Sequence, residues 1–213
     1  MYAPTHFRQQ DPAELRALIE AAPLAALVSF GNGQLQVSHI PLLFDPSPGP
    51  NGTLIGHFAA ANPQAQHYDA AIEAIAIFNG PDAYVSPNWY QTKRETAKVV
   101  PTWNYVAVYA FGRLEFIDDP AGKREIVARL TDHHEAKQPK AWSVDDAPED
   151  FVQAQLRAIR PFRFVIARLE GKWKLSQNRS AQDRAGVIEA LSADERPKPQ
   201  DAVARMRRLY EGG

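Results

Sequence analysis

Residues 79–105 read NGPDAYVSPNWYQTKRETAKVVPTWNY, and short apolar runs flank them at 74–78 and 106–108. Ordinary loops are small and polar. This segment instead mixes aromatic rings with hydroxyls, amides and a cation, and its prolines fix φ and reduce the entropy that is lost when it orders. Such a composition suits a flat ligand with polar edges and an anionic tail. We therefore expect a ligand-binding loop between two strands.

Working outward from this loop, apolar runs and turn residues predict short strands with helices between them. The expected strands are 24–30, 34–44, 53–58, 73–78, 106–117 with a bulge at Gly112, and a final hairpin of 162–169 and 172–175 over Glu170-Gly171. The expected helices are 12–20, 62–72, 119–137, 147–160, 180–191 and 201–210, with a linker over 192–200. The succession lacks a βαβ rhythm. It favours an α+β, mainly antiparallel barrel over a doubly wound sheet.

Composition limits the classes of function. The chain has 213 residues, 45% of them apolar and 23% charged, with a formal net charge of -1. A strong nucleic-acid binder usually has a basic face, so the charge argues weakly against that class. The chain contains no cysteine, which excludes disulfides and thiolate chemistry. The opening MYAPTHF has no apolar core of a signal peptide and no apolar run reaches membrane-spanning length, so we expect a cytoplasmic protein.

Several familiar sites are not supported by any motif. No G-x-G-x-x-G follows a strand and there is no P-loop, so nucleotide sites of those kinds are not indicated. His133 and His134 lack the H-E-x-x-H spacing, and we expect no metal. Ser86, His57 and Asp82 would be hydrolase candidates, but the G-x-S-x-G elbow is missing.

Some residues outside the loop suit a phosphorylated heterocycle. His39 and His57 lie near strand ends, and Asn62 begins an expected helix whose backbone N–H groups would face an anion. Gln177 and Arg179 follow the last strand and add an amide and a guanidinium. The alternative remains open that Asn62 is only a helix cap and that the tryptophans belong to the core. The clustering of polar and aromatic residues in 79–105 favours a site.

Six blocks together carry a family resemblance. They are MYAPTHF, SHIPLLFD, GHFAAANPQ, FNGPDAYVSPNWY, VPTWNY and KLSQNR. In this order and spacing the chain resembles the FMN-binding negative transcriptional regulators, the PaiB-like proteins, from residue 1 to about 190. The resemblance implies a split β-barrel related to pyridoxamine-phosphate-oxidase-like flavoproteins, with peripheral and C-terminal helices. It implies a homodimer with FMN at the subunit interface, and a role in repressing protease and sporulation genes.

Carried over residue by residue, the resemblance implies a cofactor site and leaves catalytic residues undefined. The FMN-binding residues are His39, His57, Asn62, Ser86, Trp89, Lys93, Thr102, Trp103, Asn104, Gln177 and Arg179. Ala60 stands where the family usually has an arginine, and Tyr109 where it has a histidine. Lys93 or Arg179 would then supply the charge that faces the phosphate. We expect residues 1–191 to form the flavin domain and 192–213 to form a linker and a helix packed on it.

Three hypotheses of function follow from the resemblance. The first is a regulator that senses flavin or redox state and has a DNA or regulatory protein partner. Under direct DNA binding, Arg205, Arg207 and Arg208 of the last helix would be the contacts. The second is an FMN-dependent oxidoreductase of the split-barrel type acting on an unknown small molecule. The third is a structural dimer that has lost its cofactor, which the alanine at position 60 would explain.

Overall fold

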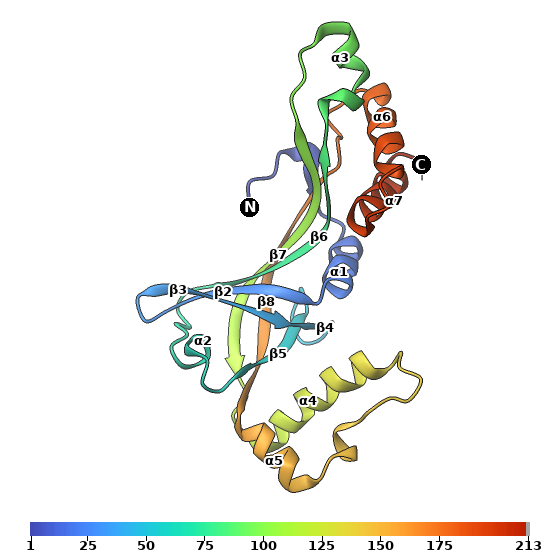
Figure 1. Cartoon of the computed structure of the whole chain (residues 1–213). Helices are drawn as coiled ribbons and strands as arrows, with labels where there is room; N and C mark the ends of the chain where they lie inside the picture. Colours follow the sequence, from blue (N-terminus) through green and yellow to red (C-terminus); the bar gives the residue numbers. More distant parts are fainter. Residues whose placement is uncertain (212–213) are drawn as a thin grey trace. The chain divides into compact units, whose positions relative to one another are not determined.

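The computed structural model describes residues 1–211, which separate into two compact units (Figure 1). Unit 1 consists of Met1–Leu15, Asn79–Val108 and the chain from Glu170 onward. Unit 2 consists of Arg16–Phe78 and Tyr109–Leu169. The fold is α+β, as predicted, and three strands contribute residues to both units.

The described residues form one sheet of eight strands in the order β3-β2-β6-β7-β8-β5-β4, with β1 paired to β8. The strands are β1 (Arg8–Gln9), β2 (Leu24–Gly31), β3 (Gln34–Pro41), β4 (Leu43–Asp45), β5 (Thr53–Ala59), β6 (Ala74–Val85), β7 (Thr102–Phe116) and β8 (Ile159–Lys174). β2 pairs with both β3 and β6, and β5 with both β4 and β8, all antiparallel. The predicted hairpin is confirmed at Asn32-Gly33, where both residues have positive φ.

The loop expected over 79–105 is shorter than predicted. β6 continues to Val85 because Ala83 and Val85 still alternate into the core, at 3% and 0% exposure. β7 already begins at Thr102, directly after Pro101. The irregular segment is therefore 86–101, with a 3-10 turn η2 (Pro87–Trp89) and a short helix α3 (Gln91–Thr96).

The predicted final hairpin over Glu170-Gly171 is wrong, because β8 runs through both residues. Gly171 is needed for close packing and not for a turn. A Cβ there would meet Leu15 Cδ2 at 2.2 Å and Gln9 O at 2.8 Å. Gly112 likewise lies within the continuous strand β7, where a Cβ would meet the Val165 carbonyl oxygen at 2.0 Å. Both glycines let neighbouring backbone or side chains approach closely.

The helix predicted over 62–72 is also much shorter in the structure. α2 spans only Pro63–Gln66, capped as expected by Asn62, whose Oδ1 accepts from Gln64 N. The chain then leaves the helix because Asp69 N donates to Phe30 O, and Asp69 Oδ1 accepts from Ala71 N. These bonds compete with helix continuation.

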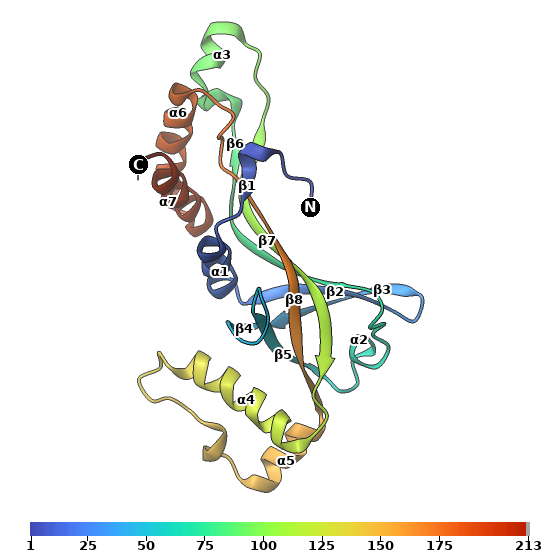
Figure 2. The same ribbon diagram turned by 180° about the vertical axis from the view of Figure 1, so that it is seen from behind.

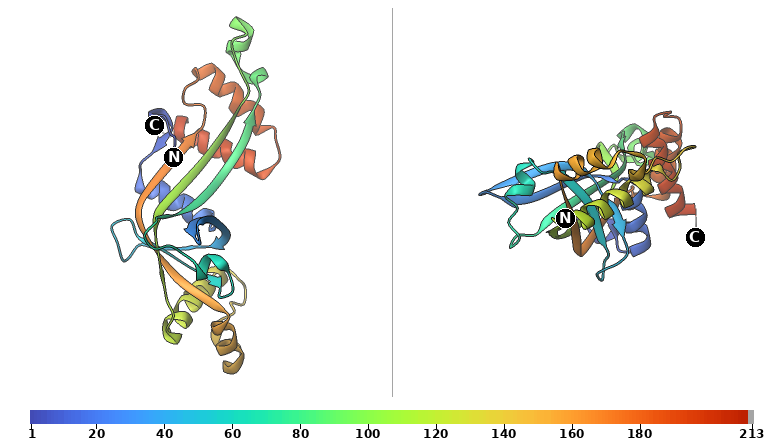
Figure 3. Two further views of the ribbon diagram at one scale, coloured as in Figure 1. Left: turned by 90° about the vertical axis from the view of Figure 1, so that its left-hand side faces the viewer. Right: turned by 90° about the horizontal axis from the view of Figure 1, so that it is seen from below.

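In unit 2, α4 (Pro120–Glu135) covers β5 and packs beside α5 (Glu149–Arg157), as Figure 3 shows. Ile55, Ile117, Ile126 and Leu130 form the buried contact between α4 and the sheet. A 3-10 turn, η3 (Val144–Asp146), lies between the two helices along the chain. Both helices match the ranges predicted from the sequence to within a few residues.

In unit 1, α6 (Ala181–Ser192) and α7 (Pro197–Glu211) lie side by side (Figure 2). The helix predicted to begin at Asp201 begins instead at Pro197, because proline is tolerated in a first helical turn. The connection expected over 192–200 is therefore shorter. The remaining elements are α1 (Pro12–Ala21), whose predicted cap Asp11 accepts from Ala13 N, and a 3-10 turn η1 (Thr5–Phe7).

Candidate functional site

The predicted site residues are divided between the two units. His39, His57 and Asn62 belong to unit 2. The others, Ser86, Trp89, Lys93, Thr102, Trp103, Asn104, Gln177 and Arg179, belong to unit 1. Each group is described within its own unit.

In unit 2, both ends of the Asn62 amide have local partners. Oδ1 caps α2, and Nδ2 donates to Ser38 Oγ at 3.0 Å. Ser38 immediately precedes His39 on β3, so Asn62 ties the start of α2 to the strand that carries this histidine. α2 is a single turn, so it contributes little of a helix dipole at its start.

One face of the sheet in unit 2 is apolar, partly exposed on β2 and β6 and most exposed along β3. The register of β2 with β3 and β6 places alternate residues of the three strands on this face. Its members are Leu24, Ala26, Val28, Phe30, Leu35, Val37, His39, Pro41, Ile75 and Ile77, and we call this set the open sheet face. Leu35 is 72% exposed and Val37 60% exposed, whereas Leu27 and Ala76 on the opposite face are fully buried. The predicted site residue His39 thus lies within an apolar surface.

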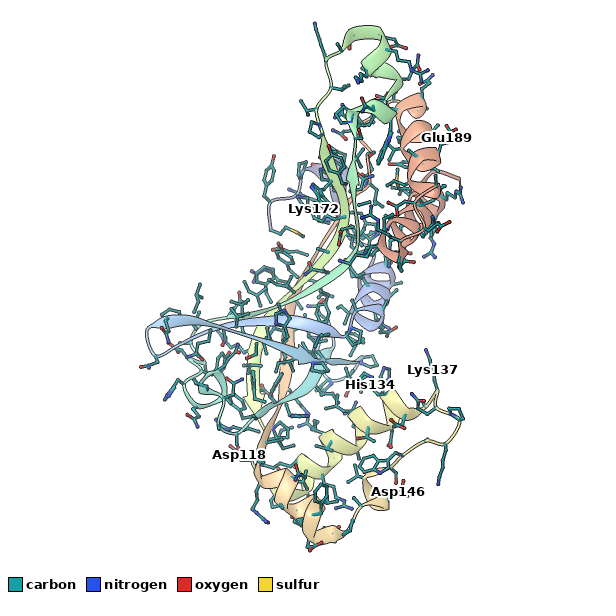
Figure 4. The ribbon with its side chains drawn as sticks, in the orientation of Figure 1. Asp118, His134, Lys137, Asp146, Lys172 and Glu189 are labelled. Atoms are coloured by element: carbon teal, nitrogen blue, oxygen red, sulfur yellow. The ribbon has the colours of Figure 1, made fainter. Side chains whose placement is uncertain are left out.

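His57 lines a cavity of about 590 Å³ at the end of α4. The other lining residues are Pro23, Leu24, Pro41, Leu130, Thr131, His134, Glu135 and Trp142. Figure 4 labels His134 on α4. The loop that carries Trp142 is held by a hydrogen bond from Trp142 N to a Glu135 carboxylate oxygen at 3.0 Å. Partial burial lowers the pKa of His57, because it disfavours the imidazolium, so this wall of the cavity is neutral near pH 7.

In unit 1, the segment 86–101 is anchored to α6 through Asp183. This carboxylate is 2% exposed and accepts from Thr92 N at 2.9 Å and from Thr92 Oγ1 at 2.7 Å. Burial opposes ionisation of Asp183, but the hydrogen bonds from Thr92 and Ser180 outweigh it and lower the pKa. Gly186 lets α6 approach closely, since a Cβ there would meet the Trp89 carbonyl oxygen at 2.1 Å. The segment is therefore fixed on helix α6.

On this anchored segment, Ser86 and Lys93 differ in whether their polar atoms already have partners within the chain. Ser86 caps η2 by accepting from Asn88 N at 3.2 Å. The exposed ammonium of Lys93 bonds to Asn88 Oδ1, and no carboxylate in residues 1–211 lies within ion-pairing distance of it. Trp89 is half-buried against α6 and lines a hollow there. Of the predicted residues on this segment, Lys93 is thus the cation that is available to an anionic ligand.

Arg179 stacks on a buried tyrosine. Its guanidinium carbon lies 4.6 Å from the ring centroid of Tyr90, which is 1% exposed. Burial raises the pKa of the Tyr90 hydroxyl, and the nearby Arg179 guanidinium opposes this shift in part. Gln177 is used locally, because its Oε1 accepts from Leu175 N and its Nε2 donates to Trp173 O.

Thr102, Trp103 and Asn104 come together with the end of β8. Lys174 Nζ donates to Thr102 Oγ1 at 2.5 Å and to the Trp103 carbonyl oxygen. Buried Asn104 accepts from Ser176 Oγ at 3.1 Å. Ser176 has φ of 70°, a left-handed conformation that is uncommon outside glycine and often occurs at functional sites. Trp103 is 53% exposed, with its ring edge-to-face with Tyr84.

Two residues beside this group are absent from the predicted set, Lys172 and Lys174. Burial lowers the pKa of Lys174, and the charges of Lys172 and Arg179 lower it further. The signal in the sequence was the alternation Lys-Trp-Lys-Leu within an expected strand, which puts two lysines on one face of it. No group of three or more potential metal ligands is gathered in the part of the chain that the structure describes.

Comparison with known protein families shows to which family the chain belongs. Residues 1–168 match the family model described as "Putative FMN-binding domain". The chain belongs to this FMN-binding family. FMN is accordingly its cofactor, as the sequence predicted.

Relatives of this FMN-binding protein occur in bacteria and fungi. "Protease synthase and sporulation protein PAI 2" of Bacillus subtilis is 28% identical, over 97% of this chain and 96% of that protein. An uncharacterized protein of Emericella nidulans is 35% identical, over 82% of this chain and 83% of that protein. The resemblance to PaiB-like proteins is therefore confirmed.

Solved structures confirm the fold. The flavocytochrome Anf3 of Azotobacter vinelandii superposes with a TM-score of 0.57 at 16% identity, covering 84% of this chain and 75% of that chain. The predicted split β-barrel is confirmed. None of the described helices is long and apolar enough to cross a membrane.

Each unit has side chains whose chemistry suits one part of FMN. A flavin ring is flat and largely apolar with a polar edge, and the open sheet face around His39 offers such a surface. A phosphate needs cationic or N–H donors. Unit 1 provides Lys93, Lys174 and Arg179, which have no carboxylate within ion-pairing distance among the described residues. Each unit taken by itself therefore offers groups that suit one part of FMN, although Ala60 supplies no charge.

Proposed function

We propose that this FMN-binding protein is a homodimeric regulator of the PaiB type that responds to the presence or redox state of its flavin. The observation that carries the proposal is the open sheet face. A monomeric soluble protein rarely leaves so continuous an apolar surface uncovered. The face includes His39, a residue of the family's cofactor motif, so one surface would serve both the cofactor and the dimer.

A second copy of the chain is the partner that suits this face best. β3 lies at one end of the sheet order, and an exposed apolar edge strand is a template for association. Interfaces of obligate homodimers are more apolar than those of transient complexes. Leu35 and Val37, exposed and adjacent to the edge, have this character.

The residues would act on FMN by binding and by excluding water. Within unit 2, the open sheet face would cover one side of the ring, and the imidazole of His39 would offer a hydrogen bond. Within unit 1, Lys93 and Arg179 are the candidates for a contact with an anionic group. When bound, FMN supplies one- and two-electron redox chemistry. A change in the charge of the ring would alter its hydrogen bonds with this surface and so bias the dimer.

The arginines of α7 weigh against direct DNA binding through that helix. Arg205 is largely buried, packs over the Trp173 ring and lies 3.6 Å from a Glu14 carboxylate oxygen. Arg208 faces the same carboxylate at 3.9 Å, and Arg207 donates to Ser192 Oγ. These side chains have intramolecular partners, so the regulatory output would depend on the flavin and on the dimer.

The experiment is complementation in cells that lack the protein. Transcript levels would be compared after expression of the wild type and of His39→Ala, with flavin occupancy measured for both purified proteins. We expect the wild type to restore repression and the flavin-depleted variant to fail. Full repression by a variant without flavin would contradict the proposal.

The cavity beside His57 favours a second candidate, an FMN-dependent oxidoreductase. A half-enclosed space with apolar walls, an indole and a neutral imidazole is typical of a small-molecule site. Anaerobic mixing with NADPH would test it. Bleaching of the flavin absorbance followed by turnover of an added acceptor would favour catalysis, and an unreduced flavin would exclude this reductant.

A further inference from the structure

Two lysines of β8 face the same side of the strand in unit 1 without an anionic partner. Lys172, labelled in Figure 4, is 9% exposed, and its Nζ donates to the Tyr2 carbonyl oxygen at 3.1 Å. The same ammonium lies 5.2 Å from the ring centroid of Tyr105. All of these partners are neutral.

Lys174 lies two residues further along β8 and is half-buried. Its ammonium donates to Thr102 Oγ1 and to a backbone carbonyl, which again are neutral groups. Each ammonium has three N–H donors. One donor of Lys172 and two of Lys174 are used by the residues that the structure describes. Three donors therefore remain for a ligand or for water.

The local charge is unbalanced. No carboxylate within residues 1–211 lies at ion-pairing distance from either ammonium. Arg8 stands directly opposite Lys172 in the β1–β8 ladder and so shares its face. Its Nε donates to the Ala3 carbonyl oxygen, another neutral acceptor. A partly buried positive cluster of this kind is stabilised by an anion.

The cluster is accessible from solvent. Tyr2 is 85% exposed and Trp103 is 53% exposed, and both flank the lysines through their backbone carbonyls. Arg8 is exposed as well. An anion therefore has a route to the ammonium groups that does not require the core to open.

We propose that Lys172 and Lys174 form a binding site for an oxyanion, a phosphate or carboxylate group, on this face of β8. The two ammonium groups supply charge-assisted hydrogen bonds, which are the strong ones in proteins. Arg8 adds a third positive charge at the rim. The inference does not depend on a regulatory role for the chain.

The test uses inorganic phosphate and the full chain freed of flavin. Phosphate affinity is measured by calorimetry at constant ionic strength adjusted with sodium chloride. We expect Lys174→Gln to weaken phosphate binding by about tenfold and Lys174→Arg to retain most of it, because arginine keeps the charge. The matched control is Lys198→Gln, which removes an ammonium of the same unit that is already paired with Asp82.

Saturating the wild type with FMN before adding phosphate identifies the source of the oxyanion. Loss of phosphate binding assigns the site to the phosphate group of FMN. Retained phosphate binding assigns it to a second, anionic ligand. Both results require the lysines and support the site.

Two results would overturn the proposal. One is a wild type that binds phosphate no better than chloride. The other is a folded Lys174→Gln variant, checked by circular dichroism, that binds phosphate as tightly as the wild type. Lys174 is the position to vary because it is half-buried, whereas a change at buried Lys172 risks the fold.

Discussion

Several arginines of unit 2 have carboxylate partners, whereas two lysines on β8 in unit 1 have only neutral ones. In unit 2, Arg129 pairs with Asp45 at 2.6 Å, and Arg160 with Asp118 at 3.1 Å. In unit 1, Lys172 and Lys174 have only carbonyl and hydroxyl partners. Ion pairs that are complete within the chain hold its elements together. Cations left with neutral partners are the ones available to a ligand.

Exposed apolar side chains are distributed between the two units in the opposite way. Unit 2 has the open sheet face, with Leu35 and Val37 exposed on an edge strand. In unit 1, α6 and α7 bury Val187, Leu191 and Met206. The comparison assigns apolar association to unit 2 and anion binding to unit 1. The following experiments test each half of that assignment.

The largest effect is expected from Val37→Asp on the open sheet face. A carboxylate placed in an apolar interface costs about 3 kcal/mol, so the dimer should dissociate about 100-fold more readily. Light scattering after size exclusion measures the change. Leu209→Asp is the control, because Leu209 is an exposed leucine of unit 1. Equal dimer stability in both variants would remove the open sheet face from the interface.

Asp183→Ala should destabilise unit 1 by about 3 kcal/mol, because it removes a buried carboxylate that accepts two hydrogen bonds from Thr92. Urea unfolding monitored by tryptophan fluorescence measures it. The pKa of Asp183 is lowered in the folded state from its ordinary value of 3.8. Its contribution is therefore present above that value and is lost as pH falls below it.

The pH dependence gives a second readout for the same carboxylate. Asp183→Asn should flatten the loss of stability in acid, since the variant has no proton to take up at this position. A variant whose stability falls below pH 3.8 as steeply as that of the wild type would show that Asp183 does not carry the effect.

Lys93→Ala should weaken FMN binding about fivefold, because an exposed ammonium contributes about 1 kcal/mol to a phosphate contact. Riboflavin, which lacks the phosphate, should bind both proteins equally. Fluorescence titration measures both ligands, with Lys98→Ala as the control from the same segment. An unchanged FMN affinity would leave Lys93 outside the site.

The smallest effect is expected from Arg129→Gln in unit 2. The pair with Asp45 is partly exposed, so its loss should cost only about 0.5 kcal/mol of unfolding free energy. Flavin and phosphate affinities should not change. A weaker phosphate affinity in this variant would contradict the view that paired cations serve only the fold.

Local sequence patterns predicted which helices, strands and turns occur better than they predicted how long each one is. The hairpin at Asn32-Gly33 and the cap at Asn62 followed from turn and capping chemistry, which involves a few neighbouring residues. The continuation of β8 through Gly171 could not be predicted from neighbouring residues. That glycine is required by Gln9 and Leu15, which are distant along the chain, so its local sequence resembled a turn.

The prediction of site residues from the sequence was limited in the same way, because it missed contacts between distant parts of the chain. The family block KLSQNR includes Lys174, but only Gln177 and Arg179 of that block were predicted to bind the cofactor, and Lys172 lies outside the block. Only the structure shows that Lys172 is buried beneath the N-terminal segment at Tyr2. Conversely, Gln177 was named from its motif, and the structure gives both ends of its amide local partners.

Native mass spectrometry of the purified chain with added FMN tests the central claim most directly. A homodimer that holds its cofactor should give one species with the mass of two 23.7 kDa chains and two FMN molecules. Val37→Asp should shift this species towards the single chain. A wild type that stays a single chain at micromolar concentration, or a dimer that takes up no FMN from excess, would contradict the account.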